Sequence, residues 1–102
     1  MFESRSQANV DESTLLEALG DPRSKAILQA TAEPMTVEEL SEACDIPLST
    51  TYRQVTRLEG ARLLEEKAAV APDGRCAAQY QRTVEKLELE LVDEELAVRV
   101  LE

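Results

Sequence analysis

The sequence predicts an α+β fold in which four short helices precede short β-strands. Two observations predict it. Apolar residues recur at helical spacing as far as Gly60. The period changes after Leu63-Leu64, and over residues 87–91 leucines alternate with glutamates, as in a strand with one buried face. A chain of 102 residues, 43% of them hydrophobic, is long enough for one domain with a single core.

The first two helices are expected on either side of a glycine. Residues 1–10 are polar and lack periodicity, which predicts a flexible N-terminal tail. Leucines at helical spacing predict a helix over residues 11–19, and Gly20 ends it. The pair Asp21-Pro22 suits the N-cap and the first position of a second helix, which ends before Glu33-Pro34.

A capping box begins the third helix. Thr36 and Glu39 can each satisfy a free backbone N–H at its start. The tight turn Asp45-Ile46-Pro47 follows, because Asp tolerates the left-handed conformation that such a turn needs. A fourth helix covers about residues 48–59. A capped helix, a three-residue turn and another helix make a helix-turn-helix.

A β-hairpin is expected after the fourth helix. Residues 65–71 and 76–82 are compatible with strands. Between them lies the turn Pro72-Asp73-Gly74-Arg75, in which Pro presets φ and Gly permits a positive φ. Beside a helix-turn-helix such a hairpin is a wing. We therefore expect residues 11–82 to form a winged helix-turn-helix domain.

The C-terminal segment 83–102 has two interpretations. Leucines alternate with glutamates over residues 87–91, and a similar alternation follows, which predicts strands and a C-terminal β extension. The alternation changes phase between Arg82 and Leu87, so we expect a bulge or a break there. Apolar residues from Val84 to Leu101 also fall near heptad spacing, which would make a helix. We favour strands, and in either form the segment is a candidate dimerisation element.

The fourth helix has two faces at about 100° per residue. The face expected to pack on the third helix holds Leu48, Thr51, Val55 and Leu58. The opposite face holds Ser49, Thr50, Arg53 and Arg57, with Tyr52 and Gln54 on the flanks. Hydroxyls near a helix N-terminus suit phosphates, Arg suits the guanine edge in the major groove and Gln suits adenine. By itself this pattern fits a solvated polar face equally well. The adjacent turn and the expected wing favour a DNA-recognition helix.

The charge distribution qualifies the acidity of the chain. Its 21 acidic and 11 basic residues give a net charge of −10, which by itself argues against nucleic-acid binding. Residues 1–45 hold 3 basic and 10 acidic side chains, and residues 83–102 hold 2 and 7. Residues 46–82 hold 6 basic and 4 acidic side chains, so only the expected recognition helix and wing carry a net positive charge.

The same composition excludes several functions. The chain has no His and only two Cys, Cys44 and Cys76, so it lacks a Ser-His-Asp triad and a His-containing zinc site. We expect no enzymatic activity, no cofactor and no metal. Cys44 suits core packing, and Cys76 beside Arg75 is a weak candidate for redox sensing. No uncharged run exceeds seven residues, so we expect no membrane span and a cytoplasmic location with reduced thiols.

Lysine occurs only at positions 25, 67 and 86. An excess of acids with few lysines fits a cytoplasm of very high salt, where screening reduces charge repulsion to short range. An ordinary acidic protein from a low-salt cell is the alternative, and we favour the halophile.

Three segments resemble ArsR-like winged-helix regulators of the small haloarchaeal type. They are Leu15-Leu16-Glu17-Ala18-Leu19-Gly20-Asp21-Pro22, Asp45-Ile46-Pro47-Leu48-Ser49-Thr50-Thr51-Tyr52-Arg53 and Leu63-Leu64-Glu65-Glu66. The resemblance implies a transcription regulator that binds double-stranded DNA, usually as a homodimer. It implies DNA-reading positions at Ser49, Thr50, Tyr52, Arg53, Gln54 and Arg57, and a wing-tip contact at Arg75.

The resemblance is incomplete in one respect. Metal-sensing members use Cys pairs or His clusters, and Cys44 has no such neighbour in the sequence, so no metal sensing is expected. The small-molecule effector and the DNA sequence stay open. The alternative function is an acidic winged-helix protein-interaction module, either an adaptor or a mimic of DNA.

Overall fold

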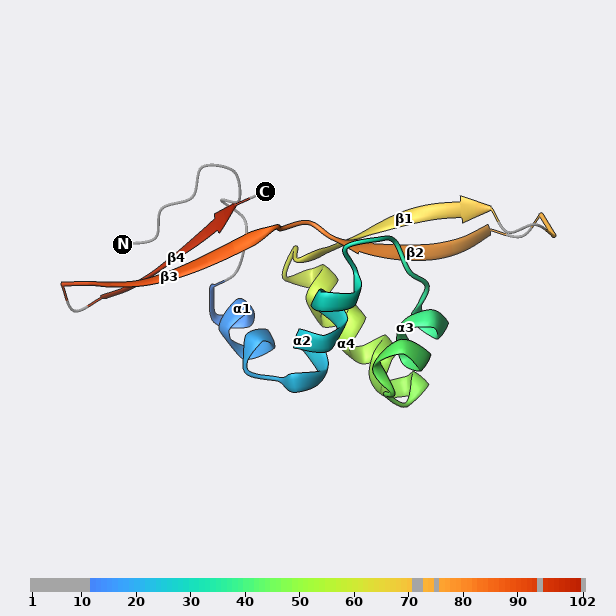
Figure 1. Cartoon of the computed structure of the whole chain (residues 1–102), viewed down its shortest axis with the longest axis horizontal. Helices are drawn as coiled ribbons and strands as arrows, with labels where there is room; N and C mark the ends of the chain where they lie inside the picture. The colour runs from blue at the N-terminus through green and yellow to red at the C-terminus, as the bar shows by residue number, and fades with distance from the viewer. Residues whose placement is uncertain (1–11, 71–72, 75, 94, 102) are drawn as a thin grey trace.

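The computed structural model describes residues 12–70, 73–74, 76–93 and 95–101, so the tail expected over residues 1–10 lies outside the described residues. Four helices precede four strands within this part of the chain (Figure 1). They are α1 (Glu12–Leu19), α2 (Pro22–Ala30), α3 (Val37–Cys44), α4 (Leu48–Gly60), β1 (Leu64–Val70), β2 (Cys76–Arg82), β3 (Lys86–Val92) and β4 (Glu95–Leu101). The fold is a winged helix-turn-helix, with α3 and α4 as the helix-turn-helix and the β1–β2 hairpin as the wing.

The helix ends follow the predicted local chemistry. Asp21 caps α2 by accepting a hydrogen bond from the backbone N–H of Arg23 at 2.9 Å. At the start of α3, the Thr36 N–H donates to Glu39 Oε1 at 2.9 Å, and the Glu39 N–H donates to Thr36 Oγ1 at 3.1 Å. Asp45 ends α3 in the left-handed conformation, with φ 56°. The capping box and the tight turn are therefore both confirmed.

The wing is an antiparallel hairpin with an extra attachment to the helices. β1 and β2 pair along their whole length, with Glu66 opposite Tyr80. The segment before α3 joins them through Met35, whose N–H donates to the Tyr80 carbonyl at 3.0 Å and whose carbonyl accepts from the Tyr80 N–H at 2.7 Å. This bridge was not predicted, and it ties the wing to the chain that leads into α3.

The C-terminal segment consists of strands, so the alternative heptad helix is wrong. β3 and β4 form a second antiparallel hairpin, with Leu89 opposite Val98 and Leu91 opposite Leu96. Residues 83–85 separate β2 from β3, which is the expected break. The alternation of Leu and Glu decides the structure, because a strand places all these leucines on one face while a helix would spread them around its axis.

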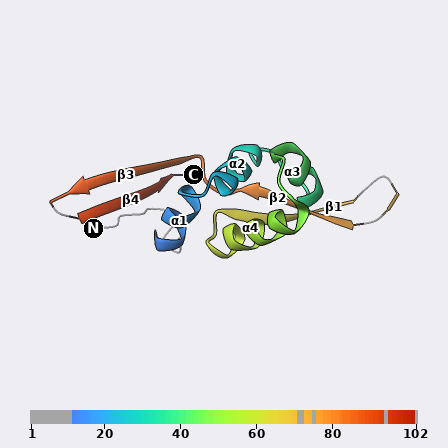
Figure 2. The ribbon, with the colours of Figure 1, turned by 90° about the horizontal axis from the view of Figure 1, so that it is seen from below.

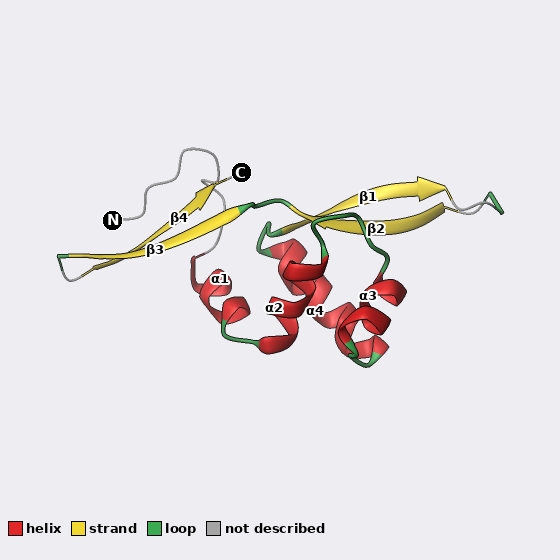
Figure 3. Ribbon diagram, viewed as in Figure 1, coloured by secondary structure: helices red, strands yellow, loops and turns green. Residues whose placement is uncertain are grey.

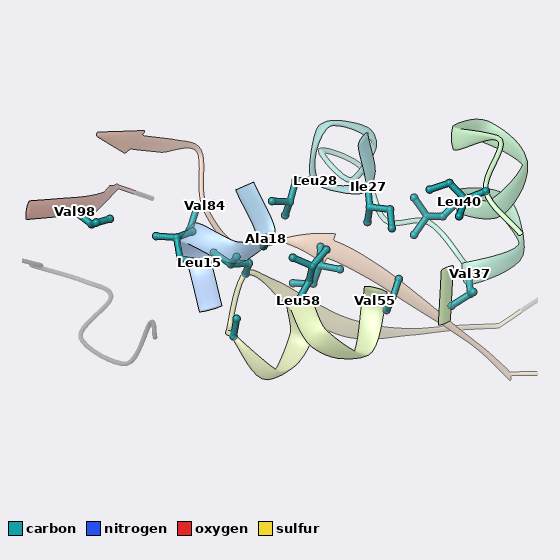
Figure 4. Packing of buried hydrophobic residues seen from close by; sticks show 14 residues of the cluster. Leu15, Ala18, Ile27, Leu28, Val37, Leu40, Val55, Leu58, Val84 and Val98 are labelled. Atoms are coloured by element: carbon teal, nitrogen blue, oxygen red, sulfur yellow. The ribbon is translucent and has the colours of Figure 1, made fainter. Parts of the chain in front are cut away.

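One hydrophobic core joins the helices to both hairpins (Figure 4). Leu15 of α1, Ile27 of α2, Leu40 of α3 and Leu58 of α4 are fully buried. Val84, Leu63, Leu64 and Val98 extend this core to the strands. Val98 of β4 is fully buried and belongs to the same cluster of buried residues.

The molecule is elongated, with extents of 55 × 25 × 17 Å. The helices gather beside the strands, and the two hairpins extend toward opposite ends of the long axis (Figures 1 and 2). Figure 3 shows the two hairpins as separate yellow ribbons joined by a short loop. The wing and the C-terminal hairpin are thus spatially separate parts of one chain.

Candidate nucleic-acid interface

The turn between α3 and α4 fixes the position of α4, the expected recognition helix. Ser41 and the fully buried Thr51 both donate hydrogen bonds to the Ile46 carbonyl, and Thr51 also donates to the Pro47 carbonyl at 3.0 Å. Pro47 precedes α4 and gives no side-chain hydrogen bond to its first N–H groups. A helix start of this kind leaves N–H groups and a positive dipole end that suit an anion such as phosphate.

The first two turns of α4 present polar side chains to solvent. Ser49 and Arg53 are exposed, Thr50 is half-buried, and the Tyr52 side chain is 50% exposed. Ser49, Thr50 and Arg53 lie as predicted on the outward side of the helix, and Tyr52, which was predicted on its flank, is exposed beside them. Their role in reading DNA stays a prediction, and the hydroxyls, the phenol and the guanidinium supply the donors that base edges and phosphates need.

Leu48 was expected to pack on α3, and this expectation is wrong because the residue is 45% exposed. Side chains of a helix point toward its N-terminus, so a residue at the first position of α4 projects past the helix rather than across it. Leu48 therefore adds an apolar group near Tyr52, one turn further along the same helix. The missed signal was its place directly after Pro47.

Gln54 and Arg57 were predicted to face outward or to the flank, and the structure corrects both. Gln54 is buried, and its Oε1 accepts a hydrogen bond from Ser24 Oγ at 2.7 Å, while its Nε2 donates to Asp21 Oδ2 at 3.2 Å. Arg57 Nη2 donates to Ser24 Oγ at 2.6 Å and approaches Asp21 Oδ2 at 3.4 Å. We call these four residues the α2–α4 polar cluster.

This cluster joins the start of α2 to the middle of α4. The bond from the Arg23 N–H lowers the pKa of Asp21, and the positive charge of Arg57 lowers it further, while partial burial acts in the opposite direction. The carboxylate is therefore ionised at neutral pH and holds Arg57 in place. Gln54 and Arg57 therefore hold α4 against the start of α2 and do not project from its exposed face.

The wing contributes fewer described groups than expected. Arg75, the predicted wing-tip contact, lies outside the described residues. Lys67 is exposed on β1 and lies 3.4 Å from Glu65 Oε1 on the same strand. Tyr80, which belongs to β2 of the wing, is half-buried, and its pKa is raised by burial and then by the nearby Glu66 and Glu59 carboxylates. Its hydroxyl thus stays protonated at neutral pH.

Residues 19–67 match a family model described as a helix-turn-helix domain. The match covers α2, α3 and α4 and ends within β1. The crystal structure of NolR from Sinorhizobium fredii is similar in fold, with a TM-score of 0.57 and 18% sequence identity, over 71% of this chain and 68% of that chain. No curated protein sequence matches the chain. The residues that match the family model thus include α4 and its exposed face.

The structure describes the side chain of Cys44 but not that of Cys76. Cys44 is half-buried against the core as a free thiol, and burial raises its pKa, which disfavours the reactive thiolate. Its predicted packing role is confirmed, whereas the side chain of Cys76 lies outside the described part.

Among the described residues, no group of three or more potential ligands could hold a metal ion. No helix among them is long and apolar enough to cross a membrane.

Proposed function

We propose that this chain is a DNA-binding transcription regulator that places α4 in the major groove. The proposal includes the finer expectations of an ArsR-like regulator, a homodimer and a cytoplasm of high salt, and it assigns a binding role rather than a catalytic one. The observation that carries it is the exposed start of α4, where Ser49, Thr50, Tyr52 and Arg53 face solvent. The winged helix-turn-helix fold and the helix-turn-helix match support it.

The way α4 is anchored strengthens the argument. The α2–α4 polar cluster and the buried Val55 and Leu58 fix the inner face of α4, so the outer face has a defined orientation. A rigid support of this kind is what base-specific contacts require, because a loosely held helix would lose entropy on binding. A homodimer would place two such helices about one DNA turn apart.

The direct test is a binding assay with a DNA fragment from upstream of the chain's own gene, in molar KCl. We expect Arg53→Ala to weaken specific binding by about 1–3 kcal/mol, because an Arg that reads a base edge contributes that much. Arg62→Ala is the matched control, since it removes an equal charge from an exposed residue that follows the other end of α4. Equal losses in both variants, or none in Arg53→Ala, would remove Arg53 from the interface.

The net charge of −10 favours a second candidate, an acidic module that binds a protein. α3 adds to this argument, because Glu38, Glu39 and Glu42 are all exposed. Such a module would be an adaptor or a mimic of DNA, and it would bind a basic partner and no duplex. In-cell crosslinking followed by sequencing separates the two, since a regulator yields enriched genomic sites and a mimic yields none.

A further inference from the structure

We propose that a cavity between α2 and the start of β3 binds a small anionic amphipathic molecule, a carboxylate with a short hydrocarbon part. The inference rests on the proposed function, because such a molecule would act as an effector of the regulator. The cavity has a volume of about 280 Å³, slightly below the range of sites for drug-sized ligands. A volume of this size suits a small molecule.

One part of the cavity wall is apolar. Leu28 and Val84 belong to the buried core, while Leu19 and Leu87 are half-buried beside it. These side chains come from α1, α2, the β2–β3 connection and β3. A hydrocarbon group in the cavity would cover apolar surface that water now contacts, which favours binding.

The rest of the wall concentrates positive charge. Lys25, Arg82 and Lys86 line the cavity, with Glu85 as the one acidic residue of its wall. The exposed Lys86 Nζ lies 3.4 Å from Glu88 Oε2, a pair that a ligand carboxylate would have to displace. Two of the three lysines in a chain of net charge −10 thus lie at one small site. Lys25 makes no ion pair with any residue that the structure describes, so its ammonium is available to an anion.

The Arg82 guanidinium is fixed at the cavity wall but is only weakly paired with Glu85, so it can pair with a ligand carboxylate instead. Its Nη1 donates to the Leu28 carbonyl at 3.0 Å, which fixes the guanidinium at the cavity wall. Its Nη2 lies 3.9 Å from Glu85 Oε1, and the Glu85 side chain is 72% exposed. A pair this long and this exposed contributes little stability, so a ligand carboxylate can replace Glu85 at small cost.

The position of the cavity links its occupant to the C-terminal hairpin. Lys25 and Leu28 belong to α2, whereas Lys86 and Leu87 belong to β3. An occupant that contacts both would favour one arrangement of the hairpin on the helices. The apolar wall favours a small amphipathic molecule over a DNA phosphate, since a phosphate has no group that would use the leucines.

Sodium octanoate is the probe, with octylammonium and 1-octanol as matched ligands of other charge. In an NMR titration of the whole chain, we expect saturable octanoate shifts at Leu28, Val84 and Leu87 and weaker binding of the other two. Lys25→Gln with Lys86→Gln should weaken octanoate binding about tenfold, because two charge-assisted contacts are lost. Lys67→Gln, an equivalent change on the wing, should leave it unchanged. The proposal is overturned if the octanoate shifts do not saturate or if octylammonium binds as tightly as octanoate. It is also overturned if Lys67→Gln weakens octanoate binding as much as the double variant does.

A second measurement separates this proposal from the proposed function. Without octanoate, the Lys25→Gln, Lys86→Gln variant should bind the upstream DNA fragment as the wild type does. A loss of DNA affinity would make these lysines phosphate contacts and would overturn the ligand site. If the wild type binds no DNA, the proposed function fails, while the octanoate titration, which contains no DNA, still decides the cavity.

Discussion

Ser24 makes two of the hydrogen bonds that hold α4 to α2. Its hydroxyl donates to Gln54 Oε1 and accepts from Arg57 Nη2, and the residue is fully buried. Ser24→Ala removes both bonds and should lower the free energy of unfolding by about 1–3 kcal/mol, measured by urea unfolding. The exposed Ser49→Ala is the control and should change it by less than about 0.5 kcal/mol. If Ser24→Ala lowers the free energy of unfolding no more than Ser49→Ala does, the two hydrogen bonds of Ser24 do not contribute to stability.

Asp21 makes the free energy of unfolding depend on pH in the acid range. Its pKa in the folded chain lies below the ordinary value of 3.8, so its contribution is present above that value and is lost as the pH falls through the lowered pKa. Asp21→Asn retains a side chain that can cap the helix but cannot ionise. We expect the wild type to be the more stable of the two at pH 7 and the difference to shrink below pH 4, as followed by urea unfolding. A difference that grows on acidification would contradict this assignment.

The orientation of some side chains could be predicted from the sequence, and that of others could not. The inward or outward direction of Thr51, Val55 and Arg53 followed from helix geometry alone. Gln54 could not be assigned in this way, because its burial depends on Asp21 and Ser24 at the start of α2, 33 and 30 residues earlier in the chain. A polar side chain is buried when a partner from another element satisfies it, and a helical period contains no information about that partner.

At the scale of elements, local chemistry specified most of the boundaries. The caps at Asp21, Thr36 and Asp45 formed as predicted because each uses atoms within a few residues of itself. The C-terminal segment was ambiguous because its apolar residues fit both a period of 2 and a near-heptad spacing. Pairing of β3 with β4 resolves this ambiguity, and it is a contact between segments that no single-element pattern contains.

The capping box gives a prediction for one helix. Thr36→Ala removes the acceptor for the Glu39 N–H at the start of α3 and should cost about 1 kcal/mol. The midpoint of thermal unfolding should fall by about 4–8 °C for a domain of this size. Thr36→Ser retains the hydroxyl and should stay close to the wild type. If both variants unfold alike, the hydroxyl does not contribute to the stability of α3.

At the scale of the whole molecule, the outer part of the C-terminal hairpin is a candidate for self-association. Leu89, Leu91 and Leu96 share one face of the β3–β4 hairpin because Leu91 lies opposite Leu96. Leu91 is 84% exposed, and the other two are exposed as well. A contiguous apolar face of this kind is typical of protein–protein interfaces. It supports the homodimer in the proposed function.

We expect Leu91→Glu to weaken self-association about tenfold or more, because it places a charge in an apolar contact. Sedimentation velocity over a range of concentrations measures the change. Glu90→Gln alters the neighbouring residue, which points to the other face, and should leave the association unaffected or stronger. A wild type that is monomeric at every concentration would refute the dimer itself.

The connection between the two hairpins has one more consequence. Arg82 ends the wing strand, its N–H donates to the Thr31 carbonyl, and the next residue, Thr83, donates to the Leu63 carbonyl. Residues 83–85 therefore connect the wing directly to the C-terminal hairpin, at the point where the wing is hydrogen-bonded to the end of α2. If the proposed DNA binding also depends on the arrangement at this junction, a molecule whose affinity depends on that arrangement is thermodynamically coupled to DNA. The factor by which it alters DNA affinity must equal the factor by which DNA alters its own, and the reciprocity can be measured from either side.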